Sequence, residues 1–243
     1  MAFFSSMSQR PSKYVLFLTC EHAGNHVPKR WQRWFATPGA QQQLRSHRGY
    51  DPGALMIARQ LAGALDIDLH YSEVSRLLIE LNRSLDSASL FSPFTQNLSD
   101  LQRQRLIEMY YMPFRQKVHR CIAEYISQRT VVLHFSVHTF TPLFRGQRRP
   151  FDIGVLFDPS RRLEQRLSQQ LVSQLGSCGY RTHANRPYLG TDDGHTTQLR
   201  QQFSSHQYVG IELELNNRIA NLSEKTQRQW SQDIADSITK LRR

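Results

Sequence analysis

Two histidines in the sequence stand where apolar segments meet polar ones. His22 follows the first predicted strand, and His138 lies near the end of a later one. Two neutral imidazoles and one carboxylate are a common ligand set for catalytic zinc, which keeps a further position open for water. The spacing leaves the third ligand open, because Asp51 begins a predicted helix whereas Glu21 would point to the opposite face of its strand. A histidine at a strand end is also explained by a structural hydrogen bond.

A pair of acidic residues, Glu212 and Glu214, lies on one face of a predicted strand, since side chains alternate along a strand with a period of two. A carboxylate beside a metal-activated water can accept its proton and return it to a leaving amine. The alternative is an edge strand whose acidic face is solvated. The spacing does not choose between the two glutamates.

The segment at 75–83 (SRLLIELNR) places Arg76, Asn82 and Arg83 around an apolar run. Planar guanidinium groups bind carboxylates through two parallel hydrogen bonds, so this segment could hold an acidic substrate. A salt bridge to a neighbouring acid such as Glu80 is the structural alternative. A second polar loop, at 185–196, is either a substrate lid or a turn-rich connection.

Nucleophilic catalysis is less well supported. Ser136 is not part of a GxSxG elbow, which disfavours a serine hydrolase. Cys20 stands close to His22 and could form a thiolate pair, but a cysteine that closes a buried strand is more often an inert core residue. The three cysteines form no CxxC pair, so a disulfide framework and a thiolate zinc site are both disfavoured.

The elements that must position these residues alternate between short apolar strands and longer amphipathic helices. Strands are predicted at 14–19, 69–71, 76–81, 130–139, 153–157 and 208–215. Helices are predicted at 51–65, at 99–128 with an interruption or restart at Pro113, at 161–175 and at 223–241. This order predicts an α/β three-layer sandwich, with a mostly parallel or mixed central sheet and helices on both faces. Ligands of such sheets bind at the carboxyl ends of the strands, which is where the histidines stand.

Composition narrows the class of protein. No linker or repeat divides the 243 residues, so we expect a single domain at 1–243. The longest apolar stretch, 14–18, is far too short to cross a bilayer, so we expect a cytoplasmic protein without a membrane partner. The formal net charge of +11 is spread along the chain, so it favours the approach of small anions over nucleic acid binding. The sequence leaves the oligomeric state open.

Six short motifs occur in an order that resembles a known family. They are CEHAGNHVP at 20–28, DPGA at 51–54, SRLLIELNR at 75–83, HTFTP at 138–142, NRPY at 185–188 and ELNN at 214–217. In this order they resemble the N-formylglutamate amidohydrolase family, over about 14–220. That family is similar, more distantly, to zinc carboxypeptidases and aspartoacylases, so the resemblance implies a zinc-exopeptidase-like fold and a metal-dependent hydrolase of non-peptide carbon–nitrogen bonds.

The resemblance also implies roles for individual residues. His22, Asp51 and His138 become the zinc ligands, although the carboxypeptidases have a glutamate ligand where this chain has Asn25. Glu214 becomes the general base, because the ELNN motif begins there, and Glu212 a supporting acid. Substrate contacts are expected from Arg76, Asn82, Arg83, Asn185 and Tyr188.

The implied substrate is a small anionic N-acyl amino acid such as N-formylglutamate. The histidine-degradation branch of the family favours Ser-Pro-His-Ser where this chain has CEHA at 20–23, so the acyl group and the amino acid stay open. Two alternatives remain. One is a zinc peptidase or cell-wall amidase, and the other is a non-catalytic protein that binds nucleic acid or an acidic partner on the same scaffold.

Overall fold

The protein is described here by a computed structural model that covers residues 14–241. Its centre is a six-stranded sheet. Four strands run parallel to one another, in the order β2 (Leu69–Tyr71), β1 (Tyr14–Cys20), β3 (Val131–Phe140) and β8 (Tyr208–Asn216). The sheet continues with β6 (Ile153–Leu156), antiparallel to β8, and β7 (Thr182–Ala184), parallel to β6. A separate two-stranded ribbon consists of β4 (Leu143–Phe144) and β5 (Gln147–Arg148).

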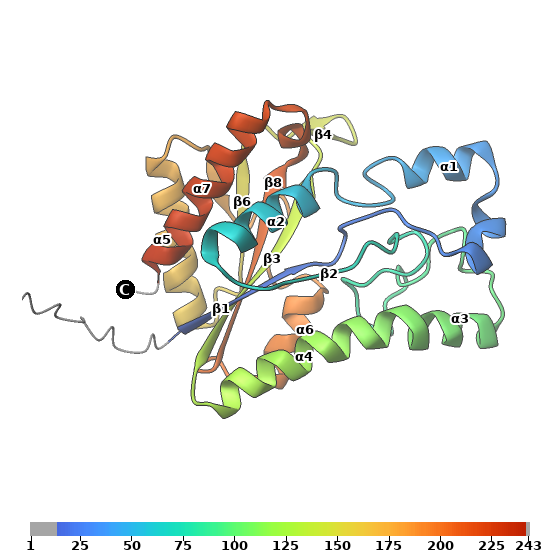
Figure 1. The fold of residues 1–243 in the computed structure, drawn as a ribbon, viewed down its shortest axis with the longest axis horizontal. Coiled ribbons are helices and arrows are strands. Elements are labelled where there is room, and N and C mark those ends of the chain that lie inside the picture. The colour runs from blue at the N-terminus through green and yellow to red at the C-terminus, as the bar shows by residue number, and fades with distance from the viewer. Residues whose placement is uncertain (1–13, 242–243) are drawn as a thin grey trace, which may run out of the picture.

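Helices cover both faces of the sheet (Figure 1). One face is covered by α2 (Ala54–Leu65), α5 (Arg162–Ser177) and α7 (Glu224–Lys240), whose apolar sides pack on the sheet in the largest core cluster. The other face carries α4 (Met112–Ser127) and α6 (His195–Gln202), with a smaller core of its own. The fold is a three-layer α/β sandwich with a mixed sheet, which confirms the predicted fold class.

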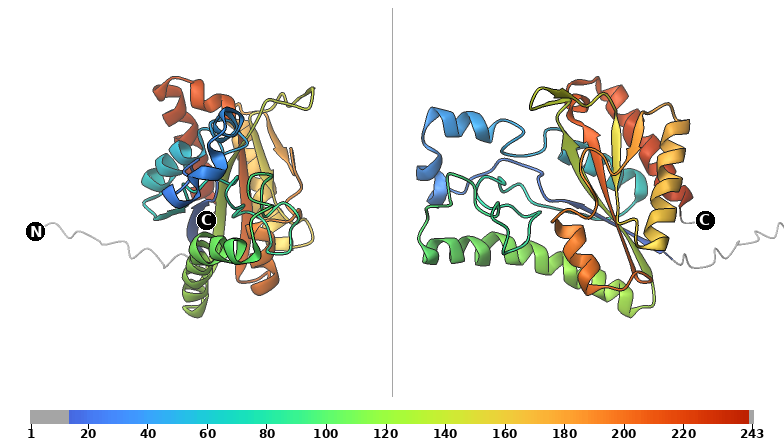
Figure 2. Two further views of the ribbon diagram at one scale, coloured as in Figure 1. Left: turned by 90° about the vertical axis from the view of Figure 1, so that its right-hand side faces the viewer. Right: turned by 180° about the vertical axis from the view of Figure 1, so that it is seen from behind.

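A lobe extends from one end of the sheet (Figure 2). It contains η1 (Lys29–Phe35), α1 (Pro38–Leu44), α3 (Asp100–Leu106) and the π-helical segment η2 (Ile107–Tyr111). These elements share a third apolar core with the loop between β2 and α3. The remaining short helix is η3 (Asn217–Asn221), directly after β8. None of the helices within 14–241 is long and apolar enough to span a membrane.

The central strands are apolar because the sheet is covered on both sides. Every residue of β3 and β8 is buried, including the polar residues in them. Polar side chains inside such strands must find partners within the protein, since burying them without hydrogen bonds costs free energy. This requirement concentrates the buried polar groups of β1, β3 and β8 into connected networks.

Local signals set several helix boundaries. Ser99 and Gln102 form a capping box at the start of α3, and the Ser223 side chain caps α7. Helix α2 begins at Ala54 rather than at residue 51, because Gly53 precedes it with a left-handed backbone (φ 88°). The predicted interruption near Pro113 takes the form of the π-helical η2, which ends immediately before α4.

The strand predicted at 76–81 is wrong. This segment is a turn, in which the amides of Leu78 and Ile79 donate to the carbonyl of Ser75. Its leucines and isoleucine are buried in the core of the lobe rather than in a sheet. An apolar run therefore indicated burial correctly, but burial does not require strand pairing.

Candidate metal and catalytic site

The candidate site lies at the carboxyl ends of β1, β3 and β8, which run parallel and so end at the same edge of the sheet. His22 follows β1, and His138 lies near the end of β3. In the register between β3 and β8, His138 stands opposite Glu214, and Ser136 stands opposite Glu212. Because β8 is a central strand and both glutamates are buried, the alternative of a solvated acidic edge is excluded.

Three side chains from separate segments converge at this edge. The Nδ1 atoms of His22 and His138 are 3.2 Å apart, and Asp51 Oδ2 lies 3.4 Å from the first and 3.0 Å from the second. All three residues are buried. A tetrahedral zinc site with bonds of 2.0–2.1 Å has edges of about 3.3 Å between its ligand atoms. The triangle therefore has the size that such an ion requires.

The protonation of both histidines follows from their other contacts. His22 Nε2 contacts Glu80 Oε1, and because a carboxylate only accepts, this nitrogen carries the proton. Ser136 Oγ donates to Glu21 Oε2 at 2.6 Å, so the hydroxyl accepts from His138 Nε2 at 2.9 Å. Both rings thus turn Nδ1 toward Asp51. Burial by itself would lower the pKa of His138, but the hydrogen bonds and charges of Asp51 and Glu21 raise that pKa well above its usual range, so without a cation Nδ1 donates to Asp51 Oδ2 at 3.0 Å. A metal ion among the three groups would take the place of this proton.

Asp51 is prepared for the same role by Arg76, whose Nη2 contacts Asp51 Oδ1. Burial by itself would raise the pKa of Asp51, but the Arg76 guanidinium and the hydrogen bonds of the histidines hold that pKa well below its usual range. The carboxylate is therefore ionised, and its second oxygen faces the histidines. Arg76, which was predicted to bind substrate, is engaged in orienting a candidate ligand.

Glu21 is the centre of a buried hydrogen-bond network behind the histidines. Its carboxylate accepts from Thr19 Oγ1 at 2.9 Å, from Ser136 Oγ and from His195 Nδ1 at 2.9 Å. Burial would raise the pKa of Glu21, yet the hydrogen bonds and charges of the neighbouring histidines hold it well below its usual range. Glu21 does not join the three converging residues. It fixes the orientation of His138 through Ser136 instead.

The two glutamates of β8 differ in their surroundings. Glu212 Oε1 accepts a hydrogen bond from Thr196 Oγ1 at 2.6 Å, whereas Glu214 Oε2 is buried with no hydrogen-bond partner among residues 14–241. Burial, with the nearby Asp51 and Glu212 carboxylates, raises the pKa of Glu214 to about 8, although His138 opposes the shift. Both carboxylates line the same cleft as the three candidate ligands.

This cleft, called the metal cleft below, has a volume of about 160 Å³. Several of the residues predicted to contact the substrate line it. Arg83 lines it and donates from Nη1 to the carbonyls of Asn82 and Asp193, at 2.7 and 2.8 Å. Asn82 also lines it, and its Oδ1 accepts from the His195 amide at 2.7 Å. Tyr188 stands at the rim with 41% of its surface exposed.

Asn185 is placed elsewhere. Its Oδ1 accepts from the amides of Phe157 and Gly190, at 2.9 and 3.1 Å, and it does not line the cleft within the described part of the chain. The side chain holds the 185–190 loop in place. Its amide oxygen accepts hydrogen bonds from two backbone N–H groups, so a structural role accounts for the polar residue at this position.

Sequence reasoning missed the residues behind the candidate ligands. Glu80 was weighed only as an ion-pair partner of arginine, Ser136 only as a nucleophile, and His195 was given no role. One signal was present, since Glu80 interrupts an apolar run and a buried carboxylate needs a partner. Nothing in the sequence placed Ser136 or His195 beside Glu21.

Comparison with known proteins identifies the family. The family model described as N-formylglutamate amidohydrolase matches residues 14–220. The chain belongs to this family. It is accordingly a hydrolase of carbon–nitrogen bonds other than peptide bonds, as the sequence motifs predicted. A search of curated proteins finds no match.

Two solved structures show the same fold. The gene product Atu2144 from Agrobacterium tumefaciens is 27% identical, with a TM-score of 0.80 over 93% of this chain and 89% of that one. The N-formylglutamate amidohydrolase from Ralstonia eutropha JMP134 is 14% identical, with a TM-score of 0.71 over 93% of this chain and 92% of that one. Because the second structure is only 14% identical, it is evidence for the fold of this chain and not for its activity.

Proposed function

We propose that this amidohydrolase is zinc-dependent and cleaves the amide bond of N-formylglutamate or a similarly small, carboxylate-bearing N-acyl amino acid. The observation that carries the proposal is the convergence of two imidazole Nδ1 atoms and one carboxylate oxygen, 3.0–3.4 Å apart, at the edge of the sheet. The family supports the reaction class, and the donor set supports the metal.

His22, Asp51 and His138 would hold the ion. Two imidazoles and one carboxylate suit zinc better than the all-oxygen sets that magnesium and calcium prefer. When bound, zinc supplies Lewis acidity that activates water and polarises a carbonyl group. Glu80 contacts and orients His22, Arg76 orients Asp51, and Ser136 orients His138. The site is therefore arranged before an ion arrives.

Glu214 would act as the general base. Its Oε2 is buried in the cleft without a partner, so it is free to accept a proton from the attacking water and to return it to the departing amine. The pKa of about 8 belongs to the site without a cation. A divalent charge nearby lowers a carboxyl pKa, which favours the ionised form that a base requires.

Arg83 and Asn82 would bind the substrate carboxylate. Both bonds that Arg83 makes within 14–241 use Nη1, so Nε and Nη2 remain for a ligand. Charge-assisted hydrogen bonds from this edge would fix the scissile carbonyl over the ligand triangle. A cleft of about 160 Å³ suits a substrate of a few carbon atoms.

A second candidate has a larger acyl group or a peptide as substrate. A cavity of about 550 Å³ shares Asp51, Arg76, Thr139 and Tyr188 with the metal cleft. Its other walls include Phe140 and Phe144, which offer apolar surface to a bulkier group. This cavity keeps the alternative of a peptidase or cell-wall amidase open as an outcome of the same experiment.

The test is elemental analysis of the purified protein, followed by an amine-release assay over N-formylglutamate, longer N-acyl glutamates and short peptides. We expect one zinc per chain and hydrolysis that stops on chelation and returns with zinc. His22→Ala and His138→Ala should lose the metal, whereas His26→Ala, an exposed histidine of the same loop, should keep it. Full activity in metal-free protein would overturn the zinc proposal. Preference for peptides would overturn the substrate proposal.

A further inference from the structure

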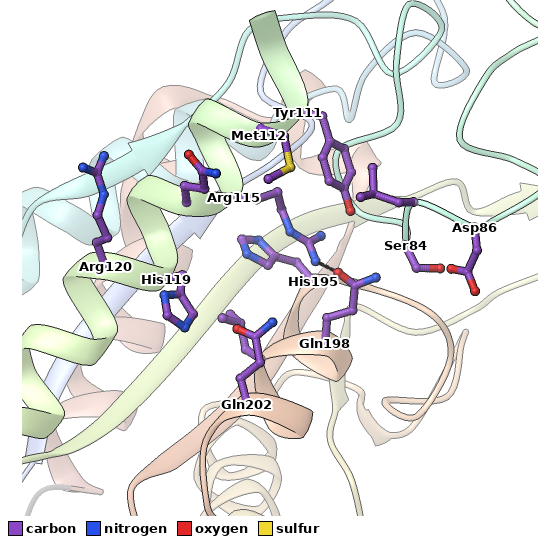
Figure 3. A pocket seen from close by; sticks show the side chains of 13 residues that line it. Ser84, Asp86, Tyr111, Met112, Arg115, His119, Arg120, His195, Gln198 and Gln202 are labelled. Carbon is purple, nitrogen blue, oxygen red and sulfur yellow. Dashed lines mark hydrogen bonds between the residues drawn. The ribbon is translucent and has the colours of Figure 1, made fainter. Parts of the chain in front are cut away.

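A second cavity is lined by His195, which does not line the metal cleft. It is formed by α4, α6 and the 84–86 loop, has a volume of about 770 Å³, and shares no lining residue with the metal cleft (Figure 3). Binding sites for small organic molecules commonly have volumes of ~300–1,000 Å³. The proposed reaction gives this cavity no role.

The wall of the cavity contains a buried cation. Arg115 is only 9% exposed, and its guanidinium forms no ion pair with any carboxylate in the described part of the chain. It donates to the Leu81 carbonyl at 3.0 Å. It also contacts Gln198 Oε1 (Figure 3), and both acceptors are neutral. A buried guanidinium without an anion is costly, and the cost shows in a pKa that burial lowers. An anionic ligand would offset it.

A second unsatisfied group stands beside this cation. His195 is 1% exposed, and its Nε2 has no hydrogen-bond partner among residues 14–241. Its Nδ1 is bound to the ionised Glu21, so Nδ1 carries the proton of the neutral ring and Nε2 presents a lone pair. Burial and the Arg115 charge lower the pKa of His195 to about 4, which keeps the ring neutral. Nε2 therefore needs a hydrogen-bond donor.

We propose that this cavity is a binding site for a small organic carboxylate that also carries a hydroxyl or amine hydrogen. The carboxylate pairs with Arg115, and the hydrogen is donated to His195 Nε2. Arg120 also lines the cavity but is exposed to solvent, so Arg115 is the buried arginine of the described lining. One buried cation calls for one negative charge, which favours a carboxylate over a dianionic phosphate. Met112 and Leu199 supply an apolar wall for the carbon skeleton. Asp86 is the one acidic side chain among the lining residues of the described chain, and it is exposed.

Fluorine NMR on the intact protein tests the proposal with three probes of one shape: 4-fluoro-3-hydroxybenzoate, 4-fluorobenzoate and the neutral 4-fluorobenzamide. We expect saturable binding of both carboxylates. The hydroxylated probe should bind about 3- to 10-fold more tightly because of the added hydrogen bond, and the amide should bind ~10-fold or more weakly. The measurement is independent of hydrolysis, so it stands whether or not the proposed reaction is correct.

Variants distinguish this cavity from the metal cleft. Arg115→Met removes the charge and keeps the chain length, and Gln202→Trp fills the cavity from an exposed position of α6. Each should weaken carboxylate binding ~10-fold or more. Arg83→Gln, in the metal cleft, should leave it unchanged. If Arg115→Met fails to fold, Gln202→Trp still decides the matter. Equal binding of the amide, loss of binding only in Arg83→Gln, or no saturable binding would overturn the proposal.

Discussion

Glu80 provides the sharpest test of how the candidate metal site is built. Its carboxylate contacts His22 Nε2 and also accepts from the Asn82 amide at 2.9 Å. Glu80→Gln keeps the shape and an oxygen acceptor but removes the charge. We expect the variant to fold and to bind zinc more weakly, because a less basic imidazole is a poorer ligand.

The magnitude follows from the type of hydrogen bond. A bond to a charged acceptor contributes ~1.5–3 kcal/mol, and a neutral bond contributes ~0.5–1.5 kcal/mol. The difference of about 1–2 kcal/mol corresponds to a rise in the zinc Kd of roughly 5- to 30-fold. This range overlaps the loss of 10- to 100-fold that substitution of a residue hydrogen-bonded to a metal ligand usually causes.

The assay is a competition titration of zinc against a chromophoric chelator at fixed pH, with unfolding measured in parallel to show that the variant is intact. Glu73→Gln is the matched control, since Glu73 is an exposed acid in the same loop and should leave the zinc Kd unchanged. An unaltered Kd in folded Glu80→Gln would refute the assignment of His22 as a ligand oriented by Glu80. A similar rise of the zinc Kd in Glu73→Gln would mean that the weaker binding comes from the change in net charge rather than from the contact with His22.

Three further predictions concern the base, the substrate anchor and acid stability. Glu214→Gln should keep its zinc and lose ~10²–10⁴-fold in kcat, and Glu212→Gln should lose far less; the reverse result would make Glu212 the base. Arg83→Lys should raise KM ~10-fold or more with little change in kcat, because lysine lacks the planar fork. An unchanged KM would restrict Arg83 to its bonds with the backbone. Burial is the main cause that lowers the pKa of His134 to about 3, so the unfolded chain binds one more proton between that value and about 6.5. The free energy of unfolding should therefore fall, as the pH drops through this window, by up to about 1.4 kcal/mol per pH unit from this group. Denaturant titrations at several pH values should show a flatter dependence in His134→Gln than in the exposed control His206→Gln, and equal slopes would contradict the assignment.

Much of the central scaffold could be predicted from the sequence. The strands β1, β3 and β8 follow from continuous apolar runs, because a sheet covered on both faces buries both sides of each strand. The same patterning gave α5 and α7, whose apolar stripes recur at helical spacing. The lobe was harder to predict. The apolar run at 76–81 is buried there without pairing to another strand, and hydrophobicity alone does not distinguish a buried turn from a buried strand.

The candidate ligands were predicted as individual residues, and their partners were not. Motif order singled out His22, Asp51 and His138, but nothing in the sequence placed Arg76 on Asp51 rather than on a substrate. Glu80 is an acidic residue within an apolar run, which indicates a buried carboxylate, but the sequence did not identify His22 as its partner. These contacts depend on where a loop of the lobe meets the end of the sheet.

What the sequence determined is the burial of its apolar runs, the position of the central strands and of the long helices, and which side chains carry suitable chemistry, since each follows from neighbours along the chain. The tertiary structure decided which of these groups meet. Glu21 joins Ser136 and His195 across sequence separations of 115 and 174 residues. Such encounters are set by the register of parallel strands and the packing of α6 on β8. A shift of one residue in the register of β3 and β8 would place the side chains of His138 and Glu214 on opposite faces of the sheet.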